Sequence, residues 1–410
     1  MNVSPHELPL VTIVTPSYNQ APYLEETIQS VLSQDYPRLE YIIIDGGSTD
    51  GSVNIIKKYE SRLAYWVSEP DAGQSDAINK GWRRAHGAIV AFLNSDDTYT
   101  PGAIRICAEY LYQHPHVGMT HGECHWIDAS GRPIGLIQAT PFTLGDLLLQ
   151  CRIAQPSTFI RKAVLDDVGL LDPNMQWLMD YELWVRIALK YPIACVPGIF
   201  ANFRIHPTSK TGTSIYHHLH DHLEIIRRGF ASPYLPRELL PLKPRAEHYA
   251  YALTAANAYS LGQFESGRAV LDAFFAEQSQ PLQFREDVIR LFANHAVSVA
   301  SLGYSAQASE DGVTSDPIQW LTRVMNALPP SAQALRGLEP DILTQIHVIQ
   351  AFGARQKGDW SETRQEIWEA VRRKPALLRQ RGIASLFAQS FARPLRKKVP
   401  VHNRFGELAS

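Results

Sequence analysis

The sequence lacks the features that mark several large classes of protein. Its four cysteines are scattered without the spacing of a metal site, and no apolar run approaches the ~18–20 residues of a membrane span. The first residues show neither the basic nor the apolar segment of a signal peptide. The net charge of −2 gives no reason to expect general nucleic-acid binding. We therefore expect a cytoplasmic protein with reduced thiols.

Two common nucleotide-binding motifs are also missing. The sequence contains neither a GxxxxGK[ST] phosphate loop nor a GxGxxG turn after its first apolar run. These absences argue against a P-loop protein and against a dinucleotide-binding domain. A nucleotide site in this chain must instead be built from side chains, with or without a metal ion.

The N-terminal part alternates between short apolar runs and segments with helical spacing. This alternation predicts an α/β fold with a mostly parallel sheet and helices on both of its faces. The predicted strands lie within residues 10–19, 39–48, 63–71 and 88–97. Polar residues cluster at the end of each run, at 15–19, 45–50, 69–76 and 94–97. Because ligands bind beyond the carboxyl ends of parallel strands, the four clusters predict one site.

From about Pro241 the sequence becomes rich in alanine and leucine with helical spacing. The segment Ala255–Phe274 can be laid over Ala351–Ala370, so that Gly262 meets Gly358. This pattern resembles tetratricopeptide-type helical hairpins, and the alternative is an all-α bundle without true repeats. A proline-rich linker precedes it, and we expect two domains, at residues 1–235 and 236–410.

An ordered set of motifs between Pro9 and Thr211 carries a resemblance to a known family. The set includes "VTIVTPSYNQ", "IIIDGGSTDGS", "EPDAGQSDAINKG", "LNSDD", "QPSTFIRKAVLDDVGLLDP", "MDYELW" and "FRIHPTSKT". Together these resemble a family 2 glycosyltransferase of the GT-A fold. The resemblance implies an α/β nucleotide-binding half joined to an acceptor half. It also implies transfer of a sugar from a nucleoside-diphosphate sugar with inversion.

The resemblance implies a divalent cation, Mn²⁺ or Mg²⁺, because "LNSDD" occupies the family's DxD position. Asp96 is then the expected metal ligand, and Asn94 replaces the first aspartate of the motif. Asparagine can still bond a ribose hydroxyl but adds no charge. The alternative is that Asp96 or Asp97 caps the helix that follows Pro101.

The resemblance also implies a donor site. The expected donor residues are Thr15, Pro16, Tyr18, Asp45, Asp76, Lys80, Asn94 and Ser95. In the family the aspartate at the position of Asp45 reads the base, usually uracil, by accepting its N–H. Four of these assignments have a plain alternative: an Asx-turn at Asp45, a core position for Tyr18, a first-turn acid at Asp76 and a solvated charge at Lys80.

The motif "MDYELW" matches the family's catalytic segment, in which an aspartate is the general base. That position is Asp180, while Met179 stands where an acidic residue is usual. Glu182 is the competing carboxylate, and two residues along a helix point about 200° apart. Gln155, Glu182 and Trp184 are assigned to the acceptor side, with Trp184 expected to pack beneath the site.

Three cationic residues of "FRIHPTSK", Arg204, His206 and Lys210, are expected to close over the diphosphate. His206 is also a second candidate metal ligand, and a structural role is its alternative. The histidines of "HHLHDH" (217–222) are interpreted as a solvated helix face. The basic C-terminal segment around Arg393–Lys398 is either a solubilising helix end or a peripheral contact with the inner face of a membrane.

The sequence therefore predicts an inverting glycosyltransferase that uses a nucleoside-diphosphate sugar, with a UDP-sugar favoured. The expected acceptor is a saccharide, a lipid-linked molecule or a protein, in bacterial cell-surface polysaccharide or glycan synthesis. A protein partner is possible through the helical domain, and no nucleic acid is expected. The alternatives are a catalytically silent sugar-nucleotide-binding protein and a nucleotidyltransferase, although "TPSYNQ" lacks the glycine and arginine that a triphosphate loop needs.

Overall fold

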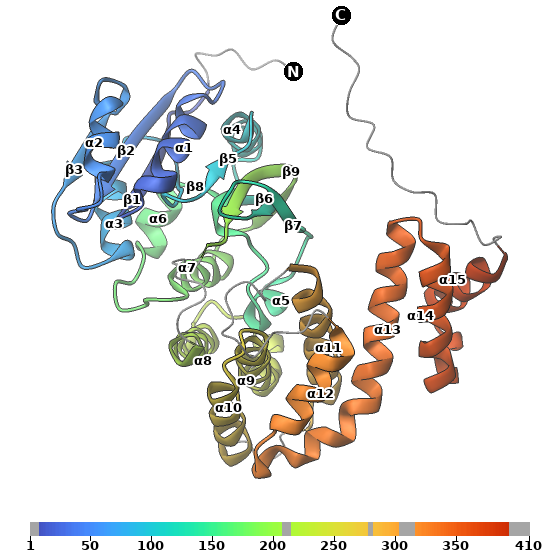
Figure 1. Ribbon diagram of the computed structural model, residues 1–410. Coiled ribbons are helices and arrows are strands. Elements are labelled where there is room, and N and C mark those ends of the chain that lie inside the picture. Colours follow the sequence, from blue (N-terminus) through green and yellow to red (C-terminus); the bar gives the residue numbers. More distant parts are fainter. Residues whose placement is uncertain (1–7, 207–214, 278–281, 303–315, 393–410) are drawn as a thin grey trace, which may run out of the picture. The chain divides into compact units, whose positions relative to one another are not determined.

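The computed structural model describes residues 8–206, 215–277, 282–302 and 316–392 (Figure 1). The chain divides into two compact units, Met1–Thr254 and Ala255–Ser410, and each is described by itself. The predicted domain limits, 1–235 and 236–410, remain a prediction about which parts fold alone. No helix in the described ranges is both long enough and apolar enough to cross a membrane.

The first unit is built on a mixed sheet with the strand order β3-β2-β1-β4-β8-β6-β9-β5, and β7 pairs with β6. Its parallel half consists of β1 (Val11–Ser17), β2 (Leu39–Asp45), β3 (Tyr65–Ser68) and β4 (Ile89–Phe92). These are the four strands predicted from the apolar runs. Consecutive buried residues along β1 and β4 agree with a sheet that is covered on both faces.

The remaining strands extend the sheet beyond β4. They are β5 (Thr98–Tyr99), β6 (Met119–Ile127), β7 (Pro133–Ile137), β8 (Phe159–Arg161) and β9 (Ile193–Arg204). β8 runs antiparallel to both β4 and β6, whereas β6 and β9 are parallel. β9 also pairs with β5, so its last residues lie beside the segment that directly follows β4. This pairing brings the end of β9 to the predicted site.

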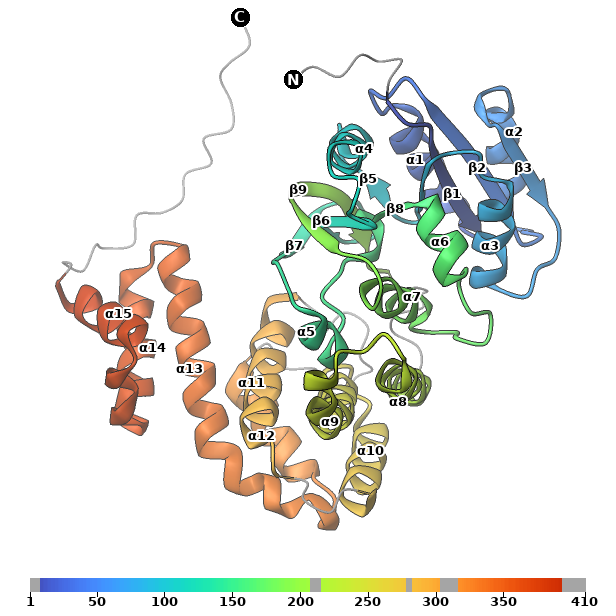
Figure 2. The same cartoon turned by 180° about the vertical axis from the view of Figure 1, so that it is seen from behind.

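Helices cover both faces of the sheet, as predicted. Those of the first unit are α1 (Ala21–Leu32), α2 (Ser52–Lys58), α3 (Gln74–Arg84), α4 (Ala103–Gln113), α5 (Leu144–Leu149), α6 (Lys162–Val168), α7 (Met179–Ala188), α8 (Ile215–Ala231) and the start of α9 (Lys243–Ser260). The opposite views of Figures 1 and 2 show α1 in front of the strands in one and α3 in front in the other. The core packs α1, α2 and α4 against β1, β2 and β4, through residues such as Ile28, Ile56 and Ile104.

The second unit is helical. Its described elements beyond α9 are α10 (Phe264–Glu277), α11 (Arg285–Leu302), α12 (Pro317–Ala327), α13 (Glu339–Gln356), α14 (Trp360–Arg373) and α15 (Arg381–Ala392). Gly262 and Gly358, which the sequence comparison aligned, both end a helix with positive φ, at 72° and 76°. This left-handed conformation favours glycine and ends a helix before the next begins. The two hairpins therefore share a turn, and a tetratricopeptide-type repeat remains a prediction.

Candidate active site

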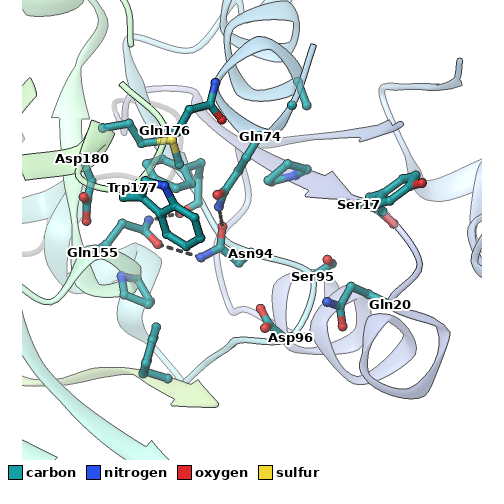
Figure 3. Close-up of a pocket in the computed structure, with 18 of the residues that line it drawn as sticks. Ser17, Gln20, Gln74, Asn94, Ser95, Asp96, Gln155, Gln176, Trp177 and Asp180 are labelled. Carbon is teal, nitrogen blue, oxygen red and sulfur yellow. Dashed lines mark hydrogen bonds between the residues drawn. The ribbon is translucent and has the colours of Figure 1, made fainter. Parts of the chain in front are cut away.

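A cavity of about 940 Å³ opens beyond the carboxyl ends of the parallel strands (Figure 3). All four predicted polar clusters contribute to its wall: Pro16 to Gln20 in part, Gly46, the segment from Pro70 to Gln74, and Asn94 to Asp96. The opposite side comes from the start of α7, from Gln155 and from the end of β9. The convergence predicted from the sequence is therefore present in the fold.

Three amide side chains form a chain of hydrogen bonds across the cavity. The Nε2 of Gln155 donates to the carbonyl of Phe92 at 2.8 Å, which leaves its Oε1 to accept from Nδ2 of Asn94 at 3.2 Å. The Oδ1 of Asn94 then accepts from Nε2 of Gln74 at 2.7 Å. Figure 3 shows these bonds joining residues that follow β3, β4 and α5. The single carbonyl of Phe92 thus orients all three amides.

Asp97 lies behind this chain and is fully buried. Its Oδ1 accepts from the backbone N–H of Arg204 at 2.9 Å, and its Oδ2 accepts from Nδ2 of Asn94 at 3.3 Å. Burial, and next the charge of Asp96, raise the pKa of Asp97 well above its usual range. The carboxyl joins β9 to the end of β4. The alternative that Asp96 or Asp97 caps the next helix is not observed, because α4 follows Gly102 without a side-chain cap.

We predict that Asn94→Asp lowers stability, although it restores the usual residue of the motif. A carboxylate at residue 94 would remove both N–H donors and face the acceptors Asp97 Oδ2 and Gln155 Oε1. Unsatisfied acceptors of this kind cost about 1–3 kcal/mol, which should lower the melting temperature by several degrees. The new carboxyl would have a raised pKa in the folded protein. The loss should therefore be small at acidic pH and grow as the pH rises.

Thermal melting from pH 5 to pH 8 measures this effect. The matched control is Asn54→Asp, the same change on an exposed position of α2, which should alter the melting temperature little. A variant at residue 94 that melts with the wild type at every pH would contradict the prediction.

Asp96 and His206 meet at the edge of the cavity. Nε2 of His206 lies 3.0 Å from Oδ2 of Asp96, and the imidazole, with 1% of its side chain exposed, also packs on Tyr23 at 4.7 Å between ring centroids. No cluster of three or more histidine, cysteine or acidic residues suited to a metal occurs in the described ranges. Two candidate protein ligands beside an open cavity would suit a divalent cation whose other ligands are phosphate oxygens and water.

Asp180 reaches the cavity from the first turn of α7. One of its oxygens accepts from the N–H of Tyr181 at 2.8 Å. In Figure 3 Asp180 lies on the side of the cavity away from Asp96, with Gln155 and Asn94 between them. The catalytic role of Asp180 remains a prediction, and its place in the cavity agrees with that role.

The start of α7 is held by α8. The Oδ2 of Asp221, which is buried, accepts from the N–H groups of Trp177 at 2.8 Å and Leu178 at 3.3 Å, directly before the helix begins. His218 and His222 of α8 pack against the rings of Trp177 and Tyr181 at 5.4 and 5.5 Å between centroids. The interpretation of these two histidines as solvated is therefore wrong.

The burial of His222 has an electrostatic consequence, since burial lowers its pKa to about 4. His220, between the two packed histidines, is 81% exposed. The histidines of α8 thus face either solvent or the start of α7, a distinction that the run of histidines concealed.

The predicted donor residues fall into two groups. Pro16, Tyr18, Asn94 and Ser95 line the cavity. The buried carboxyl of Asp45 lies outside the lining and accepts hydrogen bonds from Ser17, from the backbone and side chain of Ser48, from Gly47 and from Ser68.

The other predicted donor residues also bond within the protein. Thr15 is buried against the hydroxyl of Tyr41, and Lys80 forms ion pairs with Glu69 and Asp76. Roles for these residues in donor binding remain predictions.

The residues predicted to close over the diphosphate are similarly divided. The guanidinium of Arg204 is buried, pairs with Glu26 at 2.6 Å and donates from Nε to the carbonyl of Asp96 at 2.8 Å. Its bonds hold the segment that carries Asp96, so in this structure it supports the candidate metal site. Lys210 lies outside the described residues.

On the acceptor side, Gln155 lines the cavity but Glu182 and Trp184 do not. Glu182 is buried and bonded to Arg186 at 2.7 Å, with Arg228 at 3.7 Å. Trp184 is fully buried, as expected for packing beneath the site. The helical geometry that separates Asp180 from Glu182 thus sends one carboxylate to the cavity and the other to an internal ion pair.

Several lining residues were missed by the sequence reasoning. Trp126 of β6 and Trp177 add aromatic surface, and Gln74, Gln176 and Asp71 add polar groups. Asp71 and Gln74 belong to a strand-end cluster that was recognised, so position alone pointed to them. Trp126 lies within β6, outside the four strand-end clusters predicted from the sequence, and no local signal in the sequence connects it with this cavity.

Comparisons with known proteins agree with this geometry. Residues 12–162 match the family described as Glycosyl transferase family 2. A Bacillus subtilis glycosyltransferase named for teichuronic acid biosynthesis, TuaG, is 41% identical over 187 residues, which are 44% of this chain and 73% of that protein. An uncharacterized glycosyltransferase of Mycobacterium tuberculosis is 32% identical over 187 residues, covering 44% and 70% of the two chains.

Among solved structures, the mannosyltransferase PcManGT of Pyrobaculum calidifontis, in complex with GDP-Man and Mn²⁺, superimposes with a TM-score of 0.50. It is 19% identical and covers 73% of this chain and 86% of its own, so the likeness concerns the fold. The predicted GT-A fold and the prediction of an enzyme are confirmed. The chain belongs to glycosyltransferase family 2.

Proposed function

We propose that the enzyme transfers a sugar with inversion from a nucleoside-diphosphate sugar, with a UDP-sugar favoured. The acceptor is a hydroxyl group of a saccharide, a lipid-linked molecule or a protein, in synthesis of bacterial cell-surface polysaccharide or glycans. The observation that carries this proposal is the placement of two carboxylates on different sides of one cavity, Asp96 beside His206 and Asp180 on α7 (Figure 3). A cavity of about 940 Å³ is large enough for a nucleotide sugar.

Inversion requires the acceptor hydroxyl to attack the anomeric carbon from the face opposite the diphosphate. A hydroxyl becomes a good nucleophile only as its proton is removed, and Asp180 is the carboxylate on the side of the cavity away from Asp96. Its position at the start of α7 places its carboxylate in the cavity, where it can take the proton. The reaction then breaks the bond between the sugar and the diphosphate, and the proton of the hydroxyl remains on Asp180.

Asp96 and His206 are the residues that would hold a divalent cation, Mn²⁺ or Mg²⁺. Such a cation, when bound, stabilises the charge that develops on the departing diphosphate. The chain's own contribution is to fix the two ligands: Arg204 bonds the carbonyl of Asp96, and Tyr23 packs against His206.

The relatives support this proposal in part. The name of TuaG supports an acceptor in cell-wall polysaccharide synthesis, and the complex of PcManGT with GDP-Man and Mn²⁺ is consistent with a nucleotide sugar and a divalent cation. We place the reaction in the cytoplasm, with peripheral contact at the inner face of the membrane as a further proposal. The basic segment that motivates this contact, around residues 393–398, lies outside the described residues.

Two measurements test the function. Thermal melting with UDP-, GDP- and dTDP-sugars, each with and without Mn²⁺, should identify the donor, since a ligand at 100 times its dissociation constant stabilises by about 2.7 kcal/mol. With that donor, proton NMR during slow transfer to water should first show the anomer opposite to that of the donor. Release of the same anomer as in the donor would contradict an inverting reaction.

A further prediction concerns Asp221, which acts through the backbone at the start of α7. Asp221→Ala removes the acceptor for two N–H groups directly before Asp180. We expect kcat to fall by roughly tenfold while the affinity for the donor nucleotide changes little, because misplacement of a catalytic group reduces rate more than binding. Asp221→Asn keeps one acceptor oxygen and should recover part of the loss.

Glu224→Gln is the matched control for Asp221, because Glu224 lies on the same helix and bonds Arg227 and Arg228 instead of the start of α7. It should retain kcat. An equal loss of kcat and donor affinity in Asp221→Ala would point to general destabilisation and contradict a positioning role.

A further inference from the structure

Gly46, the residue that follows β2, lines the cavity without a side chain. A Cβ atom built on Gly46 would stand 2.8 Å from Oδ2 of Asp71, closer than such atoms approach in proteins. The carboxylate of Asp71, carried by the loop after β3, therefore occupies the space that any side chain at residue 46 would need. Both residues line the cavity.

Asp71 has an oxygen that is available for a ligand. Its Oδ1 accepts from the N–H of Gly73 at 2.8 Å, which fixes the side chain, and no hydrogen bond to Oδ2 occurs among the described residues. Asp45, at the end of β2, has no oxygen left without a hydrogen bond, since both of its oxygens accept from neighbouring serines. It also lies outside the cavity lining. At this end of the cavity the carboxylate offered to a ligand is that of Asp71.

The surroundings of Asp71 suit a flat ring. Pro16, Tyr18 and Pro70 line the cavity around Gly46, and Tyr18 is 62% exposed. Asn19, with φ of 52°, ties the loops after β1 and β2 together: its N–H donates to Ser48 Oγ and its Oδ1 accepts from the N–H of Thr49. The neighbouring Ser17 and Gln20 lie on the side of the cavity away from Asp180 in Figure 3. This end is therefore preformed and distant from the proposed base.

We propose that Asp71 reads the nucleobase of the donor by accepting a ring N–H group, an inference that rests on the proposed function. Uracil and thymine present such a group at N3 and guanine at N1, each beside a carbonyl. Cytosine and adenine present an unprotonated nitrogen at the corresponding position, which would face the carboxylate as a second acceptor. A site that leaves polar groups unpaired in this way discriminates strongly against the wrong ligand.

The experiment measures dissociation constants of UDP, dTDP, GDP, CDP and ADP by calorimetry with the full chain, in the presence of Mn²⁺. We expect at least one of the first three to bind at least ~10-fold more tightly than CDP and ADP. In Asp71→Asn the carboxamide can donate to N3 of cytosine. The ratio of the dissociation constants of CDP and UDP should therefore fall at least ~10-fold. The matched control Glu69→Gln, the same change two residues earlier at an exposed position outside the cavity, should keep the wild-type ratio.

A second measurement needs no variant. Methylation of the ring nitrogen, as in 3-methyl-UDP or 1-methyl-GDP, should weaken binding to the wild-type protein at least ~10-fold relative to the parent nucleotide, and much less in Asp71→Asn. Unchanged base preference in Asp71→Asn, or equal binding of parent and methylated nucleotides, would overturn the role of Asp71 and leave the proposed function intact. Absence of binding to any nucleoside diphosphate would overturn both.

Discussion

Asp180→Asn should lower the turnover number by ~10²–10⁴-fold while the affinity for the donor nucleotide remains near that of the wild type. The factor is that of a positioned general base, which an amide cannot replace because it does not take up a proton at neutral pH. The fold should tolerate the change, since the amide oxygen can still accept from the N–H of Tyr181, as Oδ1 does now. Steady-state kinetics and nucleotide calorimetry on the same preparation separate the two effects.

Glu182→Gln is the informative comparison, because this carboxylate lies on the same helix and the same chemical change is made. Glu182 pairs with Arg186 and approaches Arg228 in the interior, so the variant should melt at a lower temperature. Its turnover per folded molecule should stay within severalfold of the wild type. Wild-type turnover in Asp180→Asn together with a large loss in Glu182→Gln would show that the base is the other carboxylate.

The sequence predicted the parts of this site that follow from strand and helix periodicity. Runs such as 39–45 and 88–93 are apolar enough to identify central parallel strands, and such strands necessarily deliver the residues that follow them to one edge. The same reasoning separated Asp180 from Glu182, since their angular offset on a helix follows from its geometry. The structure agrees with both predictions.

The orientation of individual side chains at the strand ends was beyond such reasoning. Asp45 ends a strand in the expected place, yet Ser17, Ser48 and Ser68 converge on its carboxyl from three separate segments and hold it outside the cavity lining. The carboxylate of Asp71 lies in the space that a Cβ at residue 46 would need, a relation between two loops that appears only once both are folded. Long-range contacts of this kind leave no periodic signal.

The support of α7 by α8 was hidden for the same reason. Asp221 lies more than forty residues from the backbone groups that it bonds, in a run of histidines with the composition of a solvated face. Burial against Trp177 and Tyr181 decides the role of that run, and burial depends on which helix packs there. Of the three histidines of this run whose burial is described, His220 is the exposed one that composition predicted.

Asp96→Asn should abolish transfer and remove the part of nucleotide affinity that depends on Mn²⁺, with the fold intact. The two candidate ligands meet at 3.0 Å, and an amide is a far weaker ligand for a hard cation than a carboxylate. Stabilisation of the leaving diphosphate by a cation is worth several kcal/mol, so the loss of rate should reach at least ~10²-fold. The side chain of Asp96 is 19% exposed, and the bond from Arg204 goes to its backbone carbonyl, which the substitution does not change.

Titration with UDP, once with Mn²⁺ and once with a chelator, measures the metal-dependent part of binding to Asp96→Asn and to the wild type. Asp35→Asn is the control, since that carboxylate is 92% exposed and should keep both the activity and the response to Mn²⁺. His206→Gln removes the second candidate ligand and should weaken the response to Mn²⁺ while Asp96 still provides one ligand. Equal binding of UDP to the wild type with Mn²⁺ and with chelator would exclude the metal role of Asp96, and the "LNSDD" segment would then act through its hydrogen bonds alone.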